Sequence, residues 1–238
     1  MLVAFFLLAS MVQSPKEKDN VEKDTIPTSS GTITIYCIGH GSLMFEFKGK
    51  HIYIDPWSQQ ADYTLFPKAD LILLTHHHFD HMDEKAIGTI ATTATQIVLT
   101  SEAHHALKKG IIMRNGDTKT VEGFSIHAVP AYNTTKGHEQ FHPKGRDNGY
   151  VLILGDKKIY IAGDTEDIPE MSSLKNIDIA FLPMNQPYTM LPEQVSHAVS
   201  MFHPKILYPY HYGDTDVSII QKLLAEEKGT EVRIRSMK

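Results

Sequence analysis

The sequence of 238 residues contains a single cysteine, Cys37. One cysteine cannot form an intrachain disulfide framework or a thiolate-rich zinc site. The sequence also has no excess of positive charge, because 28 acidic residues outnumber 23 basic ones and give a formal net charge of −5. Without a basic surface to attract phosphate backbones, the protein is not expected to bind nucleic acid.

The sequence lacks a hydrophobic run long enough to cross a membrane as a helix. Its apolar N-terminal run, Leu2 to Ala9, passes into small and polar residues up to Ser14. This order is typical of the apolar part and cleavage region of a secretory signal, although the basic residues that normally precede them are missing. We interpret residues 1–14 as a signal-like segment and expect an exported or periplasmic protein, with a cytoplasmic location as the alternative.

The remaining sequence predicts one folded domain. Residues 15–31 combine charge, proline and serine with almost no apolar periodicity, which is typical of a flexible linker. From Thr32 onward, neither a tandem repeat nor a second linker interrupts the chain, so a single domain is expected over residues 32–238. A composition of 42% hydrophobic and 21% charged residues is sufficient for a buried core.

Short β-branched runs alternate with amphipathic segments in this domain. Strands are predicted at residues 32–38, 43–47, 51–54, 71–74, 97–99, 119–121, 124–129, 150–154, 158–162, 179–182, 206–208 and 231–235. Helices are predicted at residues 83–91, 101–109, 193–201 and 217–227, the second with Ser101 as its cap. Hairpins mixed with helices in this order indicate a layered α/β or α+β fold with a partly antiparallel sheet.

Histidine is unusually abundant, with 14 residues, and four of them lie between positions 76 and 81. They follow the apolar run Leu71 to Leu74, and loops at strand ends are where rigid scaffolds place reactive groups. Residues two apart in an extended segment face the same way, so His76, His78 and Asp80 are expected to project together, joined by His81 if the chain turns. Imidazole and carboxylate groups bind zinc, manganese or iron, so this cluster predicts a metal site.

The pattern His76-x-His78-x-Asp80-His81 resembles the signature of the metallo-β-lactamase superfamily. Shorter motifs extend the resemblance from about Thr32 to Arg235: Gly39-His40-Gly41-Ser42, Ile54-Asp55-Pro56-Trp57, Ala162-Gly163-Asp164-Thr165 and Pro209-Tyr210-His211-Tyr212. They look like the branch of metal-dependent hydrolases related to ascorbate-6-phosphate lactonase and N-acyl-phosphatidylethanolamine phospholipase D. The resemblance implies an αββα sandwich of two mixed β-sheets flanked by helices, with a metal site at one edge.

The resemblance also implies ligands for one or two divalent ions, with zinc expected first and manganese or iron as alternatives. The implied ligands are His76 and His78 for the first ion, Asp80, His81 and His211 for the second, and Asp164 as the bridge. Asp164 has independent support, because it follows a predicted strand and Gly163, where a small residue allows a close approach of the backbone. His40, in the first glycine loop, is a lesser candidate for contact with a ligand or the substrate.

The motifs do not supply a third histidine for the first ion. Many relatives have it just after the strand that corresponds to residues 124–129, where this sequence has none. The candidates are His142, favoured because residues 141–145 resemble a motif of the branch, and then His138. His127 falls within the strand and is expected to pack instead.

The implied activity is hydrolysis of an ester, lactone or phosphodiester bond by a metal-bound hydroxide, with Asp80 as the general base that orients it and receives its proton. The expected substrate is a small molecule or a lipid-like ester, in a pocket rimmed by residues 132–148 and 183–190. Lys136, Lys144 and Arg146 are weak candidates for attracting an anionic substrate.

A β-lactamase is not expected, because the usual dinuclear enzymes of that class carry a cysteine where this chain has Asp164. One alternative is a mononuclear iron oxidoreductase resembling thiol or persulfide dioxygenases. The other is a non-catalytic metal-binding module, which would require the metal site to be closed off from solvent.

Overall fold

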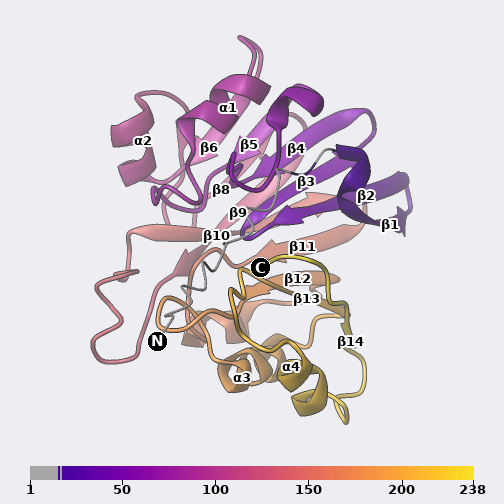
Figure 1. Cartoon of the computed structure of the whole chain (residues 1–238), viewed down its shortest axis with the longest axis vertical. Coiled ribbons are helices and arrows are strands. Elements are labelled where there is room, and N and C mark those ends of the chain that lie inside the picture. Colours follow the sequence, from indigo (N-terminus) through magenta and orange to yellow (C-terminus); the bar gives the residue numbers. More distant parts are fainter. Residues whose placement is uncertain (1–15, 17) are drawn as a thin grey trace, which may run out of the picture.

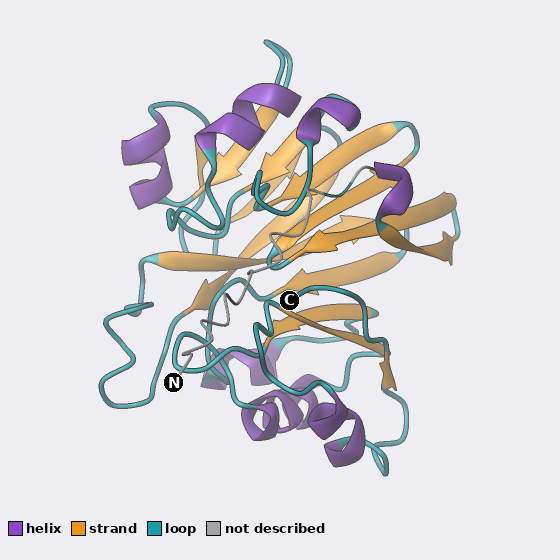
Figure 2. Cartoon of the chain, viewed as in Figure 1, coloured by secondary structure: helices purple, strands orange, loops and turns teal. Residues whose placement is uncertain are grey.

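The computed structural model describes Lys16 and residues 18–238. Within this part of the chain, two seven-stranded sheets pack face to face and helices cover their outer faces (Figures 1 and 2). This arrangement is the predicted αββα sandwich. The signal-like segment predicted at residues 1–14 lies outside the described residues. None of the described helices has the length and apolar character needed to cross a bilayer.

The first sheet contains seven strands in chain order: β1 (Glu22–Thr28), β2 (Gly31–Gly39), β3 (Ser42–Phe47), β4 (Lys50–Ile54), β5 (Leu71–Leu73), β6 (Gln96–Leu99) and β7 (Ile111–Ile112). Strands β1 to β4 pair antiparallel, whereas β4 to β7 pair parallel. Parallel neighbours require crossover connections. The helices α1 (Glu84–Ile90) and α2 (Ser101–Leu107) lie in two of these crossovers.

The second sheet repeats this topology. Its strands are β8 (Thr118–Val121), β9 (Phe124–Ala131), β10 (Asp147–Leu154), β11 (Lys157–Ile161), β12 (Ile179–Pro183), β13 (Ile206–Tyr210) and β14 (Glu231–Val232). Strands β8 to β11 pair antiparallel and β11 to β14 pair parallel. The crossovers after β12 and β13 contain α3 (Pro192–Phe202) and α4 (Ser218–Leu223), so the two halves share one strand pattern without a visible sequence repeat.

Strand β1 corrects the prediction of a flexible linker over residues 15–31. Residues 22–28 pair along their whole length with β2, and Ile26 is buried. The strand lies at the edge of its sheet, where charged residues and Pro27 are tolerated because one side needs no pairing. Because its composition is polar, this strand shows no apolar periodicity and could not be predicted from it.

The ends of several predicted elements also shift. The cap of α2 is Thr100 rather than Ser101, because the Thr100 side chain accepts a hydrogen bond from the Ala103 amide. The helix predicted at 217–227 is shorter, as is the last strand. The two-residue strand β7 was not predicted at all, since so short a run gives no periodic signal.

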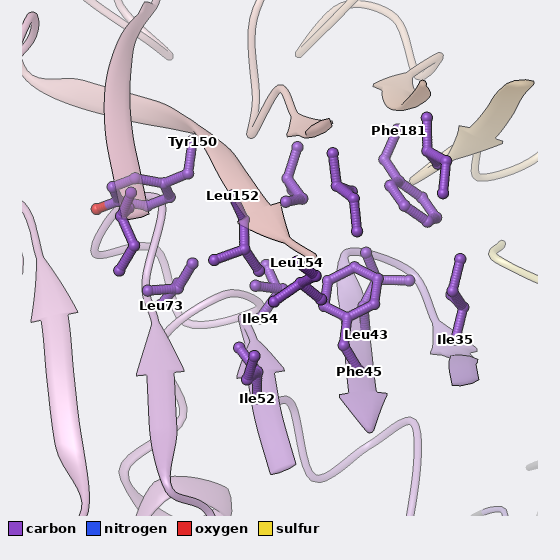
Figure 3. Close-up of a cluster of buried hydrophobic side chains, with 14 of the residues drawn as sticks. Ile35, Leu43, Phe45, Ile52, Ile54, Leu73, Tyr150, Leu152, Leu154 and Phe181 are labelled. Atoms are coloured by element: carbon purple, nitrogen blue, oxygen red, sulfur yellow. The ribbon is translucent and has the colours of Figure 1, made fainter. Parts of the chain in front are cut away.

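The main hydrophobic core lies between the two sheets. Figure 3 shows Leu43 and Phe45 of the first sheet near Leu154 and Phe181 of the second. The Phe181 ring lies 6.0 Å from that of Phe45 across the sandwich and stacks on Tyr208 at 4.9 Å. Two further clusters pack each sheet against its own helices. Both sheets are thus fixed on both faces, which gives their strand ends defined positions.

Removing the Phe181 ring should therefore test this core. We expect Phe181→Ala to lower the free energy of unfolding by about 3–5 kcal/mol, because it leaves a cavity between the sheets. The matched control is Phe79→Ala, whose ring is 72% exposed and whose loss should change stability by at most about 0.5 kcal/mol. Urea denaturation measures both. Equal losses in the two variants would contradict the position of Phe181 in the core.

Candidate metal centre

The candidate ligands follow the carboxyl ends of parallel strands in both sheets. Residues 76–81 come soon after β5, Asp164 after β11 and His211 directly after β13. Ligand sites in sheets with parallel strands typically form outside these ends. The structure brings the three segments together at one edge of the sandwich, as the ion-pair and ring contacts described below demonstrate.

Local hydrogen bonds give the histidine cluster its shape. The amides of His81 and Met82 both donate to the His78 carbonyl oxygen, at 3.0 and 2.8 Å. This turn reverses the chain and carries His81 to the side of Asp80, as the sequence predicts. The rings of His76 and His78 lie edge to face with centroids 4.6 Å apart.

Among the described residues, three groups of possible ligand atoms have all their atoms within 4.8 Å of one another, and the third, Asp55 with His76 and His81, shares its histidines with the other two. The first group is His76, His78 and His142, and the second is His40, Asp80, His81 and His211. The structure therefore brings His142, and not His138, to the first group. His138 lies instead beside Glu166, with its Nδ1 3.5 Å from the carboxylate Oε1.

Asp164 lies between the first two groups. Its Oδ2 is 3.4 Å from His142 Nε2 and 3.3 Å from His211 Nε2, and its Oδ1 is 3.5 Å from His81 Nε2. Two atoms bound to one tetrahedral ion at about 2.0–2.1 Å are separated by roughly 3.3–3.4 Å. These spacings suit carboxylate and imidazole groups that share a cation. The preceding glycine is required, because a Cβ on Gly163 would lie 2.9 Å from the Asn148 carbonyl oxygen.

A buried carboxylate, Asp55, orients two of the imidazoles. Its Oδ2 contacts His81 Nδ1 at 2.8 Å and accepts a hydrogen bond from the Thr75 hydroxyl at 2.6 Å. That hydroxyl lies 2.9 Å from His76 Nδ1. Both rings are thus held through Nδ1, which directs Nε2 toward the centre, as outer partners of metal-bound histidines do.

Asp147 orients His142 in the same way. Its Oδ2 lies 3.0 Å from His142 Nδ1, and both carboxylate oxygens accept hydrogen bonds from Arg146 at 2.8 Å. The guanidinium group of Arg146 also donates to the Phe141 carbonyl oxygen. Asp55 and Asp147 have no role in the sequence-based prediction. Asp55 stands in a motif that resembles the superfamily, but the motif gives no role, and Asp147 carries no local signal beyond its charge.

Several polar atoms at this centre are buried without a hydrogen-bond partner among the described residues. They are Nε2 of His76, Nε2 of His81, both ring nitrogens of His211, and Oδ1 of Asp164. A buried polar atom that forms no hydrogen bond costs free energy, so a group of them calls for an explanation. Imidazole nitrogens and a carboxylate are a donor set for zinc, manganese or iron. The cluster is thus able to bind metal.

Burial keeps three of the imidazoles neutral. It lowers the pKa of His78 and that of His211 to about 4, and the pKa of His76 well below its usual value. Neutral imidazole is the form that binds a metal ion. These three side chains therefore need not lose a proton before they bind a metal ion.

The pKa values of His81 and two carboxylates shift so that the charged form of each group is favoured. Burial lowers the pKa of His81, but Asp164 and Asp55 outweigh it and raise that pKa to about 10. Burial raises the pKa of Asp80, but a hydrogen bond from His40 and the charge of His81 outweigh it and bring it to about 2. Burial likewise opposes ionisation of Asp164, yet His211 and His81 hold its pKa well below the usual value. The carboxylates are ionised at neutral pH.

An open cavity of about 600 Å³ leads to this centre. Its lining includes Asp80, Asp164 and His211 together with Phe141 and Tyr188 from the two loops predicted to form the rim. The predicted rim is therefore confirmed. The size is that of a site for a small molecule.

The prediction for His127 is wrong. It was expected to pack, but its side chain is exposed and its Nδ1 contacts the Thr118 hydroxyl at 3.0 Å. Alternate residues of a strand face opposite sides, and in β9 the neighbours Ile126 and Ala128 take the buried side.

Comparison with known proteins gives consistent matches. A family model, the beta-lactamase superfamily domain, matches residues 34–211. The UPF0173 metal-dependent hydrolase of Enterococcus faecalis is 34% identical over 191 residues, which cover 74% of this chain and 85% of that protein. The UPF0173 metal-dependent hydrolase of Caldivirga maquilingensis is 32% identical over 219 residues, which cover 84% of this chain and 93% of that protein.

Two solved structures show the same fold. A protein from Parabacteroides distasonis with a crystal structure is 51% identical in sequence to this chain. The two structures have a TM-score of 0.90, and the match covers 92% of this chain and 100% of that chain. The metallo hydrolase Igni18 of Ignicoccus hospitalis has a TM-score of 0.70 at 23% identity, over 85% and 94% of the two chains.

Protons should compete with metal ions at His81. Because its pKa is raised to about 10, this imidazole carries a proton at neutral pH in the metal-free protein, and a cation can bind Nε2 only after that proton leaves. Zinc binding should therefore release protons, and the apparent affinity should rise about tenfold per pH unit between pH 6 and 8 for each proton released. Calorimetry in buffers of different ionisation enthalpy measures this, with His127→Ala as the control. An affinity that is constant over this range would contradict the assignment.

Proposed function

The chain belongs to the metallo-β-lactamase superfamily, as its motifs predict, and is a metal-dependent hydrolase; on this basis we propose that it cleaves an ester, lactone or phosphodiester bond at a centre of two divalent ions. The observation that carries the proposal is the convergence of unpartnered imidazole nitrogens on the Asp164 carboxylate, at the floor of an open cavity. Zinc is the first candidate metal, with manganese and iron as alternatives.

We assign each ion a set of side chains from their grouping. His76, His78 and His142 would hold one ion, and Asp80, His81 and His211 the other, with Asp164 between them. When bound, such ions polarise the bond under attack and lower the pKa of a water molecule toward neutrality. Asp55 and Asp147 would keep the imidazoles in the orientation that this requires.

Asp80 is the proposed general base. Its carboxylate lines the cavity, and its lowered pKa of about 2 keeps it ionised, so it can orient a water molecule and accept its proton. His40 Nε2 lies 3.1 Å from Asp80 Oδ2, and the His40 ring packs on His211 at 3.7 Å. His40 would thereby fix the direction of the carboxylate and is a positioning residue.

The two alternatives receive less support. A non-catalytic module would need a closed site, whereas the cavity opens onto the candidate ligands. An iron dioxygenase would need oxygen for turnover, and the relatives named above are described as hydrolases. Turnover of an ester under anaerobic conditions would separate hydrolysis from oxygenation.

Loss of one ligand should remove both metal and activity. We expect His76→Ala to bind at least one metal ion fewer per chain, and to lose at least about 100-fold in kcat/KM, because even an outer partner of a ligand contributes 10- to 100-fold. Elemental analysis measures the metal, and hydrolysis of p-nitrophenyl acetate, a lactone and bis(p-nitrophenyl) phosphate measures activity. The matched control is His127→Ala, an exposed histidine, which should retain both. Full turnover by a metal-free preparation would disprove the proposal.

A further inference from the structure

Two pairs of aromatic side chains lie at the cavity. The rings of Trp57 and Phe79 lie 6.0 Å apart at an interplanar angle of 76°, and those of Phe141 and Tyr188 lie 5.0 Å apart at 71°. Phe79, Phe141 and Tyr188 belong to the lining, while Trp57 packs against Phe79 and, at 4.9 Å, against the His40 ring. Three aromatic side chains therefore contribute to the cavity lining.

Two of these rings are exposed to solvent at the cavity. Phe79 is 72% exposed and Tyr188 is 46% exposed. Large exposed apolar groups at a concave site mark a binding surface more often than isolated ones do. Phe79 also lies between His78 and Asp80 in the sequence, so its ring is positioned by the same turn that positions two candidate ligands.

The second pair, Phe141 and Tyr188, is held by hydrogen bonds to the backbone of Tyr188. The Tyr188 amide donates to the Asn185 carbonyl oxygen at 3.0 Å, and the Tyr188 carbonyl oxygen accepts from the Asn133 side chain at 2.7 Å. Asn133 in turn donates its amide to the His142 carbonyl oxygen. Because these bonds fix the Tyr188 backbone, less conformational entropy is lost when a ligand packs on its ring.

No lysine or arginine contributes to the cavity lining within the described part of the chain. Arg146 is engaged by Asp147 and by the Phe141 carbonyl oxygen. Lys144 is engaged by the Tyr132 hydroxyl and Glu170. Two of the three basic residues that the sequence offered for an anionic substrate thus have other partners, and the third, Lys136, is exposed and lies outside the cavity lining. An anionic group of the substrate away from the scissile bond would therefore find no lysine or arginine in the described cavity lining.

From these observations we propose that the substrate is a neutral carboxylic ester, lactones included, whose aromatic or alkyl group packs against the rings of Phe79 and Tyr188. This inference rests on the proposed hydrolytic function and narrows its substrate class. In the reaction, the oxygen of water bonds to the acyl carbon and the bond from that carbon to the alkoxy oxygen breaks. The alcohol leaves with one proton, and the acid product loses the other to solvent.

The chain offers an internal probe of binding at this rim, because Trp57 is its only tryptophan. We expect ethyl phenylacetate to cause a saturable change in tryptophan fluorescence of the metal-free protein. Ethyl acetate and the anion monoethyl succinate should cause none at the same concentrations. Tyr188→Ala, which leaves the Trp57 pair intact, should weaken the binding of ethyl phenylacetate about tenfold, a size typical of an aromatic contact.

The matched control is Leu65→Ala. Leu65 is an apolar side chain that is 51% exposed and lies outside the cavity lining, so this variant should bind as the wild type does. Binding of ethyl phenylacetate that is absent, or that is equal in the wild type and Tyr188→Ala, would overturn the inference.

Hydrolysis of the same esters separates this inference from the proposed function. In protein loaded with zinc or manganese, acid release at constant pH should show at least tenfold higher kcat/KM for ethyl phenylacetate than for ethyl acetate or monoethyl succinate. Phe79→Ala and Tyr188→Ala should each reduce that ratio about tenfold. Cleavage of bis(p-nitrophenyl) phosphate without cleavage of any neutral ester would overturn the inference alone. Binding of ethyl phenylacetate without hydrolysis of any substrate would overturn the proposed function alone.

Discussion

The buried carboxylate of Asp164 attracts imidazole groups that come from three separate segments of the chain. His81 follows β5, His142 lies in the loop before β10, and His211 follows β13, yet each has a ring nitrogen 3.3–3.5 Å from Asp164. Such proximity requires both sheets to present their strand ends at one edge, which the core between them ensures. The sandwich therefore acts as a scaffold that holds buried nitrogen and oxygen atoms, which have no hydrogen-bond partners in the described part of the chain, close enough together to bind a cation.

Two kinds of interaction surround the centre: hydrogen bonds to the candidate ligands and aromatic rings at the cavity. On the inner side, Asp55 and Asp147 hold imidazoles through Nδ1, so the orientation of the ligands is fixed by hydrogen bonds. On the outer side, aromatic rings take the place of charged groups, with Phe79 and Tyr188 facing the cavity. We therefore assign chemistry and substrate selection to different residues, which can be changed separately.

The sequence reveals the part of the site that is local. Residues 76–81 carry their ligands within one turn, and the motif around Asp164 identifies the partner segment by its glycine requirement, so both could be predicted. The choice between His142 and His138 could not, because it depends on how a long loop folds back over β10. Asp147 was missed for a related reason, because its contact with His142 depends on the conformation of the same loop. Strand β1 was missed because its polar composition gives no apolar periodicity, although it pairs with the next strand.

We propose that two cations lie on either side of Asp164. Anomalous diffraction at the metal absorption edge, from crystals grown with zinc or manganese, tests it directly. The account predicts one peak among His76, His78 and His142, and a second among Asp80, His81 and His211, with Asp164 between them. Peaks located elsewhere, or no peak in crystals of protein that hydrolyses its substrate, would contradict it.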